Sequence, residues 1–272
     1  MNMWNWMKKG WSIAWQQPFA VFVLFFYNFA WGVVLYKLIQ SIVVPLLHRY
    51  PGKELTREAV QLFWVEGQFQ LIKTDLIMPY LWWGLGLLGL RMLLNPMLNA
   101  GVYYSLHHQE LNAGYRFVEG IRKLTLPFLG LYILQMLCSL APLYWLIPHT
   151  LREYATQSSY MSLGKALLPF LGGYMIYLFV VQLFFLFLQI GKVDRRSSLF
   201  TVLFVLRHLL IIMLTALGVL LITFAASAVV MISAYIWAGF AALIGFQLYR
   251  FMDMFLKLWA IGTQYALWSE KA

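Results

Sequence analysis

One uncharged run constrains this chain more than any other feature. Residues 209–249, 41 residues in all, contain no charged side chain. A single helix of that length would be about 60 Å long, twice the roughly 30 Å of hydrocarbon in a bilayer. We therefore expect the run to fold back and to cross a membrane twice. No Gly, Pro or charge marks a turn near its centre, so length alone places the turn between Ala225 and Ser233.

The composition of the rest of the chain agrees with a lipid environment. Apolar residues make up 62% of the 272 residues and charged residues only 11%, whereas soluble domains carry about 25% charged residues. These values exclude an ordinary soluble globular protein and a disordered chain. The single cysteine, Cys138, excludes a module held together by intrachain disulfides.

The length criterion predicts an all-α, polytopic transmembrane bundle of six spans in a single domain, 19–272. The spans are expected at about 19–39, 76–94, 124–147, 166–190, 209–227 and 230–249. The segment between His48 and Asp75 is expected to hold a partly amphipathic surface helix. After the last span, Arg250, Asp253 and Lys257 have the spacing of a cytoplasmic amphipathic helix with its own ion pairs.

The first 18 residues form a separate amphipathic arm. On a helical wheel, Trp4, Trp11 and Trp15 make one apolar stripe, flanked by Met7 and Ala14, and the neighbouring sector is polar with Asn5, Lys9, Ser12 and Gln16. Such a helix is expected to lie in the headgroup plane with its indoles inward. Pro18 then marks the corner where the chain enters the first span, which is retained because no cleavage site follows it.

The distribution of basic residues predicts the orientation. With six spans, 13 of the 20 Lys and Arg residues fall on the side of the two termini, and the two sides carry net charges of +8 and +2. Because basic residues are retained on the cytoplasmic side, we expect a plasma-membrane protein with both termini in the cytoplasm. A basic inner face against anionic lipid accounts for the overall charge of +10, so no nucleic-acid partner is expected.

The second span carries a candidate polar site. Arg91, Asn95 and Asn99 stand four residues apart on one helix face, and Pro96 among them frees a backbone carbonyl near Met92. A cation, two amides and an unpaired carbonyl suit a polar ligand inside a membrane. The alternative is that Arg91 reaches the inner headgroups and that the asparagines bond to neighbouring helices.

No catalytic motif is found, and the chain is not expected to be an enzyme. His107, His108, Glu110 and Glu119 are the loosely placed acid–base candidates for an enzyme acting on lipid headgroups. Their spacing does not match known zinc or di-iron patterns, so neither metal nor cofactor is expected. Gly84, Gly86 and Gly89, with alanines of the last span, offer small-residue faces for helix packing.

Several short segments carry a family resemblance. These are the Trp-rich arm ending in Gln17–Pro18, Asn95–Pro96, Gly101, the run Gly114–Tyr115–Arg116–Phe117, and Gly120. Together with the six spans, this pattern resembles a family of six-helix integral membrane proteins of Gram-positive bacteria. That family is similar to the membrane domain accompanying some glycerophosphodiester phosphodiesterases. The resemblance implies the fold and a bacterial plasma membrane, and it carries over no catalytic residue because the soluble phosphodiesterase domain is absent.

These observations favour a non-enzymatic accessory or permease-like component for export or handling of a lipid or amphipathic solute. The chain has no energy-coupling motif, so a second membrane subunit or a nucleotide-hydrolysing subunit is the expected partner besides the lipid bilayer. Two alternatives remain open at this point: a membrane-embedded enzyme acting on lipid headgroups, and a passive envelope assembly or stress factor.

Overall fold

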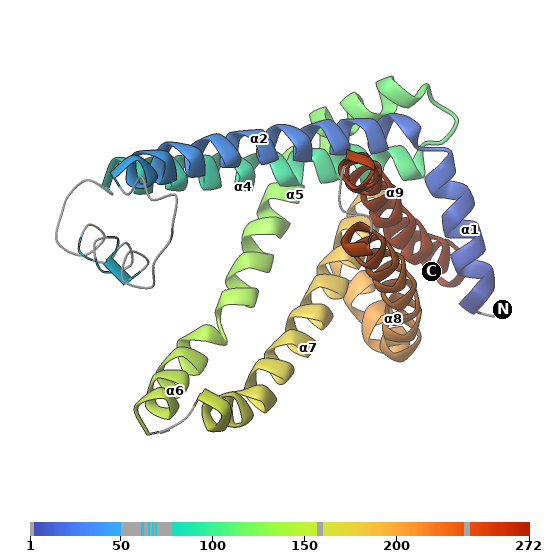
Figure 1. Cartoon of the computed structure of the whole chain (residues 1–272). Coiled ribbons are helices and arrows are strands. Elements are labelled where there is room, and N and C mark those ends of the chain that lie inside the picture. Colours follow the sequence, from blue (N-terminus) through green and yellow to red (C-terminus); the bar gives the residue numbers. More distant parts are fainter. Residues whose placement is uncertain are drawn as a thin grey trace. The chain divides into compact units, whose positions relative to one another are not determined.

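The computed structural model describes residues 3–49, 61–62, 65, 67, 69, 78–156, 160–236 and 240–272. Every element in these residues is a helix, which confirms the all-α prediction for this part of the chain (Figure 1). The elements are α1 (Met3–Trp15), α2 (Pro18–Arg49), α4 (Met78–His107), α5 (Ala113–Leu140), α6 (Leu143–Thr156), α7 (Tyr160–Val193), α8 (Ser198–Ile236) and α9 (Phe240–Lys271).

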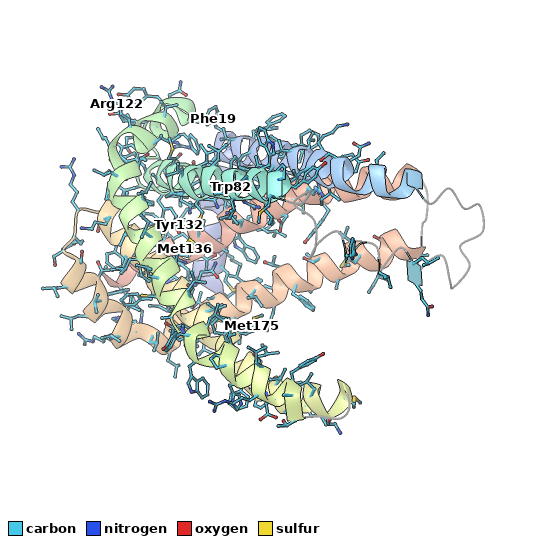
Figure 2. All side chains as sticks on the ribbon, turned by 90° about the vertical axis from the view of Figure 1, so that its left-hand side faces the viewer. Phe19, Trp82, Arg122, Tyr132, Met136 and Met175 are labelled. Carbon is cyan, nitrogen blue, oxygen red and sulfur yellow. The ribbon has the colours of Figure 1, made fainter. Side chains whose placement is uncertain are left out.

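Five segments of the described residues are long and apolar enough to cross a membrane, as a multi-pass membrane protein requires. They are Pro18–Ser41, Met78–His107, Ala113–Thr156, Met161–Val193 and Ser198–Ser233. Long apolar side chains cover the outer faces of these helices (Figure 2). Trp82 and Met175, for example, are 72% and 68% exposed, which suits a lipid surrounding and not water.

The predicted turn between Ala225 and Ser233 is wrong. α8 continues without interruption to Ile236, and α9 begins at Phe240. The hydroxyl groups of Thr223 and Ser227 donate to the carbonyls of Val219 and Thr223, four residues back, so these polar residues stay inside the helix. With no Gly or Pro to break it, the helix runs for 39 residues, about 58 Å. The expected boundary between spans 209–227 and 230–249 therefore falls inside one helix.

Two other connecting segments differ from expectation. The link expected between the second and third spans is short, because α4 runs to His107 and α5 begins at Ala113. The surface helix expected between His48 and Asp75 lies almost entirely outside the described residues.

The chain divides into two compact units, each of which is described by itself. Unit 1 comprises Met1–Phe22 and Pro96–Ala272, and unit 2 comprises Val23–Asn95. In unit 1, α9 packs against α1 on one side and α8 on another. The second half of α9, predicted as an amphipathic segment, buries its apolar side completely at Leu258 and Leu267, while Lys257 stays exposed.

The crossing of α1 and α9 depends on glycine. A Cβ atom on Gly10 would lie 2.5 Å from the backbone nitrogen of Thr263, and one on Gly262 would lie 3.0 Å from the Gly10 carbonyl oxygen. The Trp259 indole donates to the Met7 carbonyl at 2.9 Å. One residue earlier in α1, the Trp6 indole donates to the Glu270 carboxylate at 2.9 Å. The two ends of the chain therefore lie side by side (Figure 1).

α1 consequently has two apolar faces. Trp6, Met7 and Ala14 are buried within unit 1, whereas Trp4 and Trp15 are 57% and 73% exposed. Met7 and Ala14, placed beside the tryptophan stripe on the helical wheel, thus belong to the packed face. The arm is a helix docked on the bundle: Trp4 and Trp15 are largely exposed, whereas the Trp11 ring packs edge-on against Phe255 and Trp259 of α9.

Unit 2 is a hairpin formed by α2 and the first part of α4. The Tyr80 hydroxyl donates to the Ser41 carbonyl at 3.4 Å near one end, and the Tyr27 hydroxyl lies 3.0 Å from Asn95 Oδ1 near the other. These contacts make the two helices antiparallel. Few side chains in this hairpin are buried, so most of its surface faces the surroundings.

Candidate functional site

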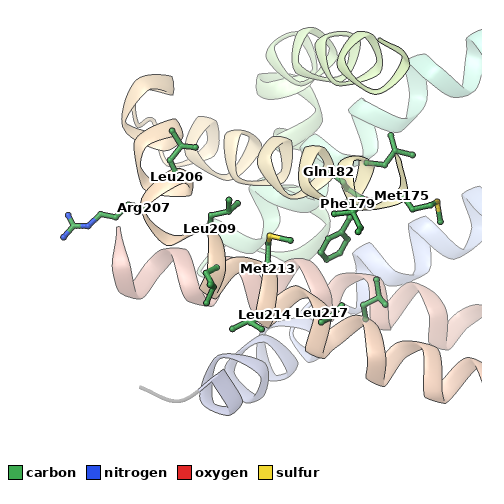
Figure 3. A pocket seen from close by; sticks show the side chains of 13 residues that line it. Met175, Phe179, Gln182, Leu206, Arg207, Leu209, Met213, Leu214 and Leu217 are labelled. Atoms are coloured by element: carbon green, nitrogen blue, oxygen red, sulfur yellow. The ribbon is translucent and has the colours of Figure 1, made fainter. Parts of the chain in front are cut away.

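An apolar groove of about 1050 Å³ runs between α7 and α8 in unit 1 (Figure 3). α7 contributes Met175, Ile176, Leu178 and Phe179, and α8 contributes a row of Leu and Met side chains from Leu206 to Leu220. Along α8 this row extends for about 21 Å at the usual helical rise. The groove is therefore long, narrow and almost entirely hydrocarbon.

Only two polar side chains line the groove, Gln182 of α7 and Arg207 of α8. Arg207 is exposed, lies at the end of the groove nearer to the α7–α8 turn, and points away from the apolar lining (Figure 3). No ion pair within the described residues uses its guanidinium group. The groove thus has one charged end and one apolar end.

The turn that joins the two walls of the groove has a fixed geometry. Arg195 adopts a left-handed conformation with φ of 56°. Its neighbour Arg196 donates a backbone bond to the Gly191 carbonyl at 3.0 Å, and Arg195 donates one to the Lys192 carbonyl at 3.3 Å. This pair of bonds is the Schellman motif that ends a helix. The left-handed residue of that motif, here Arg195, is usually a glycine. The turn therefore sets the distance between α7 and α8 at the charged end of the groove.

A polar cluster holds this turn against the end of α9. The Asp194 carboxylate accepts a bond from the Trp268 indole at 3.3 Å and lies 3.5 Å from Arg196 Nε. His107, at the end of α4, places Nδ1 3.1 Å from the Tyr265 hydroxyl and 3.9 Å from Asp194 Oδ1. The cluster thereby ties together three helix ends that are far apart in the sequence.

The electrostatic environment keeps the Tyr265 phenol protonated. Burial is the main factor that raises the pKa of Tyr265, and the negative charges of Asp194 and Glu110 raise it further. Tyr265 therefore remains a neutral donor throughout the physiological pH range. Its hydroxyl can donate a hydrogen bond to His107 Nδ1 when that nitrogen is unprotonated.

The four acid–base candidates from the sequence do not form one catalytic group. Glu119 pairs with Lys123 at 3.0 Å on its own helix. His108 stacks on Tyr104 with ring centroids 4.0 Å apart. Only His107 reaches a carboxylate on another element, Asp194. Across the described ranges, no group of three or more His, Cys, Asp or Glu residues is placed to hold a metal ion.

A second polar network in unit 1 is centred on Arg116, whose side chain is 96% buried. Its NH2 nitrogen donates to the Gln16 carbonyl at 2.8 Å and to Gln17 Oε1 at 3.1 Å, and NH1 donates to the Gln109 carbonyl at 3.1 Å. Gln17 and Ser105 exchange two further bonds of 2.9 and 2.6 Å. The guanidinium is thus held by neutral oxygens, and it connects the α1–α2 corner to the facing ends of α4 and α5.

Glycines let these helices approach closely. A Cβ atom on Gly120 would lie 2.9 Å from the Ala100 carbonyl oxygen, and one on Gly101 would lie 3.0 Å from the Phe117 ring. The α4–α5 crossing beside Arg116 is therefore a contact of backbone against backbone. The crossing positions the two helices, and the Arg116 side chain beside it has almost no access from outside.

The residues predicted as a polar site, Arg91, Asn95 and Asn99, all lie on α4. Arg91 is exposed and lies over the Trp31 ring, 5.9 Å from its centroid. Asn95 is occupied by the Tyr27 hydroxyl, and Asn99 is half-buried. α4 stays helical through Pro96. A role for these residues in ligand binding remains a prediction.

Sequence reasoning missed the groove and did not interpret Arg116. The groove could not be predicted because an uncharged run has the same hydrophobicity whether its helix faces lipid, protein or a cleft. For Arg116 there was a signal: Gln17–Pro18 and Gly114–Tyr115–Arg116–Phe117 were noted as short motifs. What brings them together is a hydrogen bond across about 100 positions of the chain, and spacing along one helix does not reveal such a bond.

Gln264 is a further buried polar residue that spacing does not explain. It is 2% exposed, and neither Oε1 nor Nε2 has a hydrogen-bond partner within the described residues. Burial of an unpaired amide is unfavourable by roughly 1–3 kcal/mol. The surroundings of Gln264, in the C-terminal part of α9, are therefore not optimised for stability.

No protein family, curated protein or solved structure matches this chain. The family resemblance noted in the sequence thus remains a prediction. A proposal of function therefore has to be built on the groove, on its charged end and on the polar cluster beside it.

Proposed function

We propose that this chain is a non-enzymatic plasma-membrane protein that holds a lipid or another amphipathic solute in the α7–α8 groove. It would act as an accessory or permease-like component in the export or handling of that solute. The groove carries this proposal, because it is large and its lining is almost entirely apolar. The resemblance to six-helix membrane proteins of Gram-positive bacteria is in keeping with it.

The chemistry of the groove fits an amphipath. Ligand sites for small molecules have volumes of about 300–1,000 Å³ and are mainly apolar, with a few polar groups that fix orientation. Here the volume is about 1050 Å³, and the polar groups are Gln182 and Arg207. A fully polar solute would find almost no hydrogen-bond partner along the groove, whereas a hydrocarbon chain would find continuous apolar contact.

Contacts within unit 1 support an even number of membrane crossings. Trp268, near the end of α9, reaches Asp194 in the turn that precedes α8, so α9 runs back along α8. Although α9 is not among the five helices that are long and apolar enough by themselves, we infer that it crosses back as the sixth span. Its last turns, with Tyr265 and Trp268, then lie outside the hydrocarbon beside the α7–α8 turn, and both termini lie on the more basic, cytoplasmic side. The exposed tryptophans of α1, Trp4 and Trp15, then face the headgroup region, where indole rings are favourable.

The topology has a direct test. A reporter fused after Ala272 is expected to be cytoplasmic, on the same side as a reporter placed before Met1. External labelling at residue 272 would contradict a return of α9 and would leave five spans.

The lipid-holding function is tested by filling the groove. Leu214→Trp adds bulk to the lining, whereas Leu203→Trp adds the same bulk to an α8 position that is 67% exposed and outside the lining. Both proteins are purified in mild detergent, and co-purifying lipid is measured by native mass spectrometry. We expect bound lipid to be lost only in Leu214→Trp. Equal lipid retention in the two variants would contradict the proposal.

The accessory role is tested separately by purification from membranes. The chain itself has no energy-coupling motif, so a nucleotide-hydrolysing subunit is expected to co-purify in mild detergent. Recovery without any partner, in the presence of the solute, would count against a role in export while leaving lipid binding intact.

One observation favours the enzymatic alternative. His107 and Asp194 are 3.9 Å apart beside Tyr265, and a His–carboxylate pair at a membrane surface is a possible base for headgroup chemistry. His107→Ala and Asp194→Asn should then each abolish turnover of headgroups in membranes containing the purified chain. Absence of turnover by the unmodified chain would exclude this alternative.

A further inference from the structure

The groove has a length and a position that identify its occupant more closely. From Leu209, the first residue after the charged part of α8, to Leu220 at the far end of the lining, α8 rises by about 17 Å. One leaflet contributes half of the roughly 30 Å of hydrocarbon. The apolar part of the groove is therefore as long as one leaflet is deep, which suits one acyl chain lying parallel to α8.

The charged end of the groove lies where a headgroup would be. Arg207 precedes a run without charged residues, 209–249, so it stands at the boundary between hydrocarbon and headgroups if that run is immersed. Ser198–Ser233 has 36 residues and is about 54 Å long, about 24 Å more than the hydrocarbon. A centred helix leaves about 12 Å outside on each side, and Arg207 lies about 14 Å from its start.

Other cations at this end do not line the groove. Arg196 lies 3.5 Å from Asp194 and 5.4 Å from the centre of the Phe200 ring. Arg195 holds the left-handed position of the turn and is not part of the groove lining. Arg207 is the lining cation, its guanidinium points out of the apolar part, and a phosphate oxygen is a strong acceptor for such a donor.

We propose that the groove binds an anionic phospholipid of the leaflet on the basic side, with the headgroup phosphate on Arg207 and an acyl chain running toward Met175 and Leu220. This proposal rests on the proposed function and adds the ligand class and its orientation. Charge complementarity supports this occupant: the groove has a single charge, which is positive and at one end. A partner helix would instead require apolar or paired contacts along the whole groove.

The charge preference is measured with the full chain in nanodiscs. Nanodiscs of zwitterionic phosphatidylcholine contain a small fraction of phosphatidylglycerol, and the ratio of the two lipids retained by the protein is read by native mass spectrometry after release. One basic residue near an anionic membrane is worth about fivefold in binding. We expect Arg207→Gln to reduce the preference for phosphatidylglycerol by about that factor and Arg207→Lys to retain most of it.

The control removes an equal charge elsewhere. Arg122 is an exposed cation on α5, outside the groove, and its side chain is visible in Figure 2. Arg122→Gln should leave the preference unchanged. Equal reductions in Arg122→Gln and Arg207→Gln would overturn the proposal in favour of a general attraction by net charge. Competition by millimolar glycerol phosphate would also overturn it, because a site for the headgroup alone needs no groove.

The orientation is measured with photoreactive lipids. A phosphatidylglycerol with a diazirine at the end of its acyl chain should label residues near Met175 and Leu220, and one with a diazirine near the glycerol should label residues near Leu206. The reversed pattern, or labelling only of residues outside the groove, would overturn the proposal.

The two proposals can fail separately. If Leu214→Trp expels both lipids while Arg207→Gln leaves the preference intact, the lipid-holding function stands and the headgroup site is wrong. If Leu214→Trp leaves both lipids bound, the function itself is wrong.

Discussion

Glycines at the helix crossings of unit 1 and glycines of the α4 part of unit 2 have different surroundings. In unit 1, Gly10 and Gly120 lie where two helices cross, and a Cβ atom on either would collide with backbone atoms. In unit 2, Gly84, Gly86 and Gly89 have nothing within 4 Å of a Cβ position. The spacing of glycines predicted close packing for unit 2, and close packing occurs in unit 1. A small residue therefore permits an approach of helices, but the approach requires a facing partner.

The arginines of the two units differ in the same way. Arg91 of unit 2 is exposed over the face of Trp31, whereas Arg116 of unit 1 is buried and bonded to oxygens of three residues. The sequence identifies Arg91 as a candidate site residue because its polar neighbours lie on the same helix. The partners of Arg116 come from other parts of the chain. Tight packing and buried polar groups are thus concentrated in unit 1.

The largest expected effect is at the α4–α5 crossing. Gly120→Ala places a methyl group 2.9 Å from the Ala100 carbonyl oxygen, and backbone cannot move aside as a flexible side chain would. We expect a loss of stability of about 1–3 kcal/mol or more, measured as a lower melting temperature in detergent.

Gly86→Ala of unit 2 is the matched control on α4. It meets open space, so it should be neutral or stabilise the helix by up to about 1 kcal/mol. Similar destabilisation by the two substitutions would break the comparison between the units.

The next effect is the removal of a buried cation. Arg116→Gln deletes donors that satisfy the Gln16 and Gln109 carbonyls, and bonds to charged donors are worth about 1.5–3 kcal/mol each. We expect a loss of roughly 2 kcal/mol in thermal unfolding, together with faster proteolysis near the α1–α2 corner. A melting temperature equal to that of the unmodified chain would show that the Arg116 network contributes nothing to stability.

A smaller effect with a pH signature is expected at Tyr265. Because its pKa is raised in the folded chain, the unfolded chain loses this proton first as the pH increases. The stabilising contribution is thus complete below pH of about 10 and disappears at higher pH. Tyr265→Phe should reduce stability by about 1 kcal/mol near neutral pH and flatten the alkaline part of the profile.

Tyr27→Phe is the counterpart in unit 2, where the hydroxyl meets the neutral amide of Asn95. Its unfolding should keep the alkaline slope of the unmodified chain. If Tyr265→Phe leaves the alkaline slope unchanged, the Tyr265 phenol is not the cause of the loss of stability at alkaline pH.

The sequence predicts the features that depend on interactions within one segment, and it does not predict those that depend on contacts between distant segments. The helical class and the approximate centres of five spans come from hydrophobicity and length, which each segment carries by itself. The end of α8 was placed incorrectly because a length argument demanded a turn where no residue breaks the helix. The contacts from Asp194 to Trp268 and from Arg116 to Gln17 join residues 74 and 99 positions apart. Periodicity within one helix contains no information on such pairs.

The smallest expected effect is at Arg91, and it decides whether unit 2 holds a polar site. On the Trp31 face, a Lys ammonium can replace the guanidinium, because a cation–π contact at an exposed position is worth only about 0.5–1 kcal/mol. Arg91→Lys should therefore change stability by less than about 0.5 kcal/mol and leave any phenotype of a deletion strain fully complemented. A ligand site shared with Asn95 and Asn99 would need the forked guanidinium geometry, which Lys lacks. If Arg91→Lys expresses normally and fails to complement, Arg91 takes part in a ligand site, and the contact with Trp31 does not account for its role.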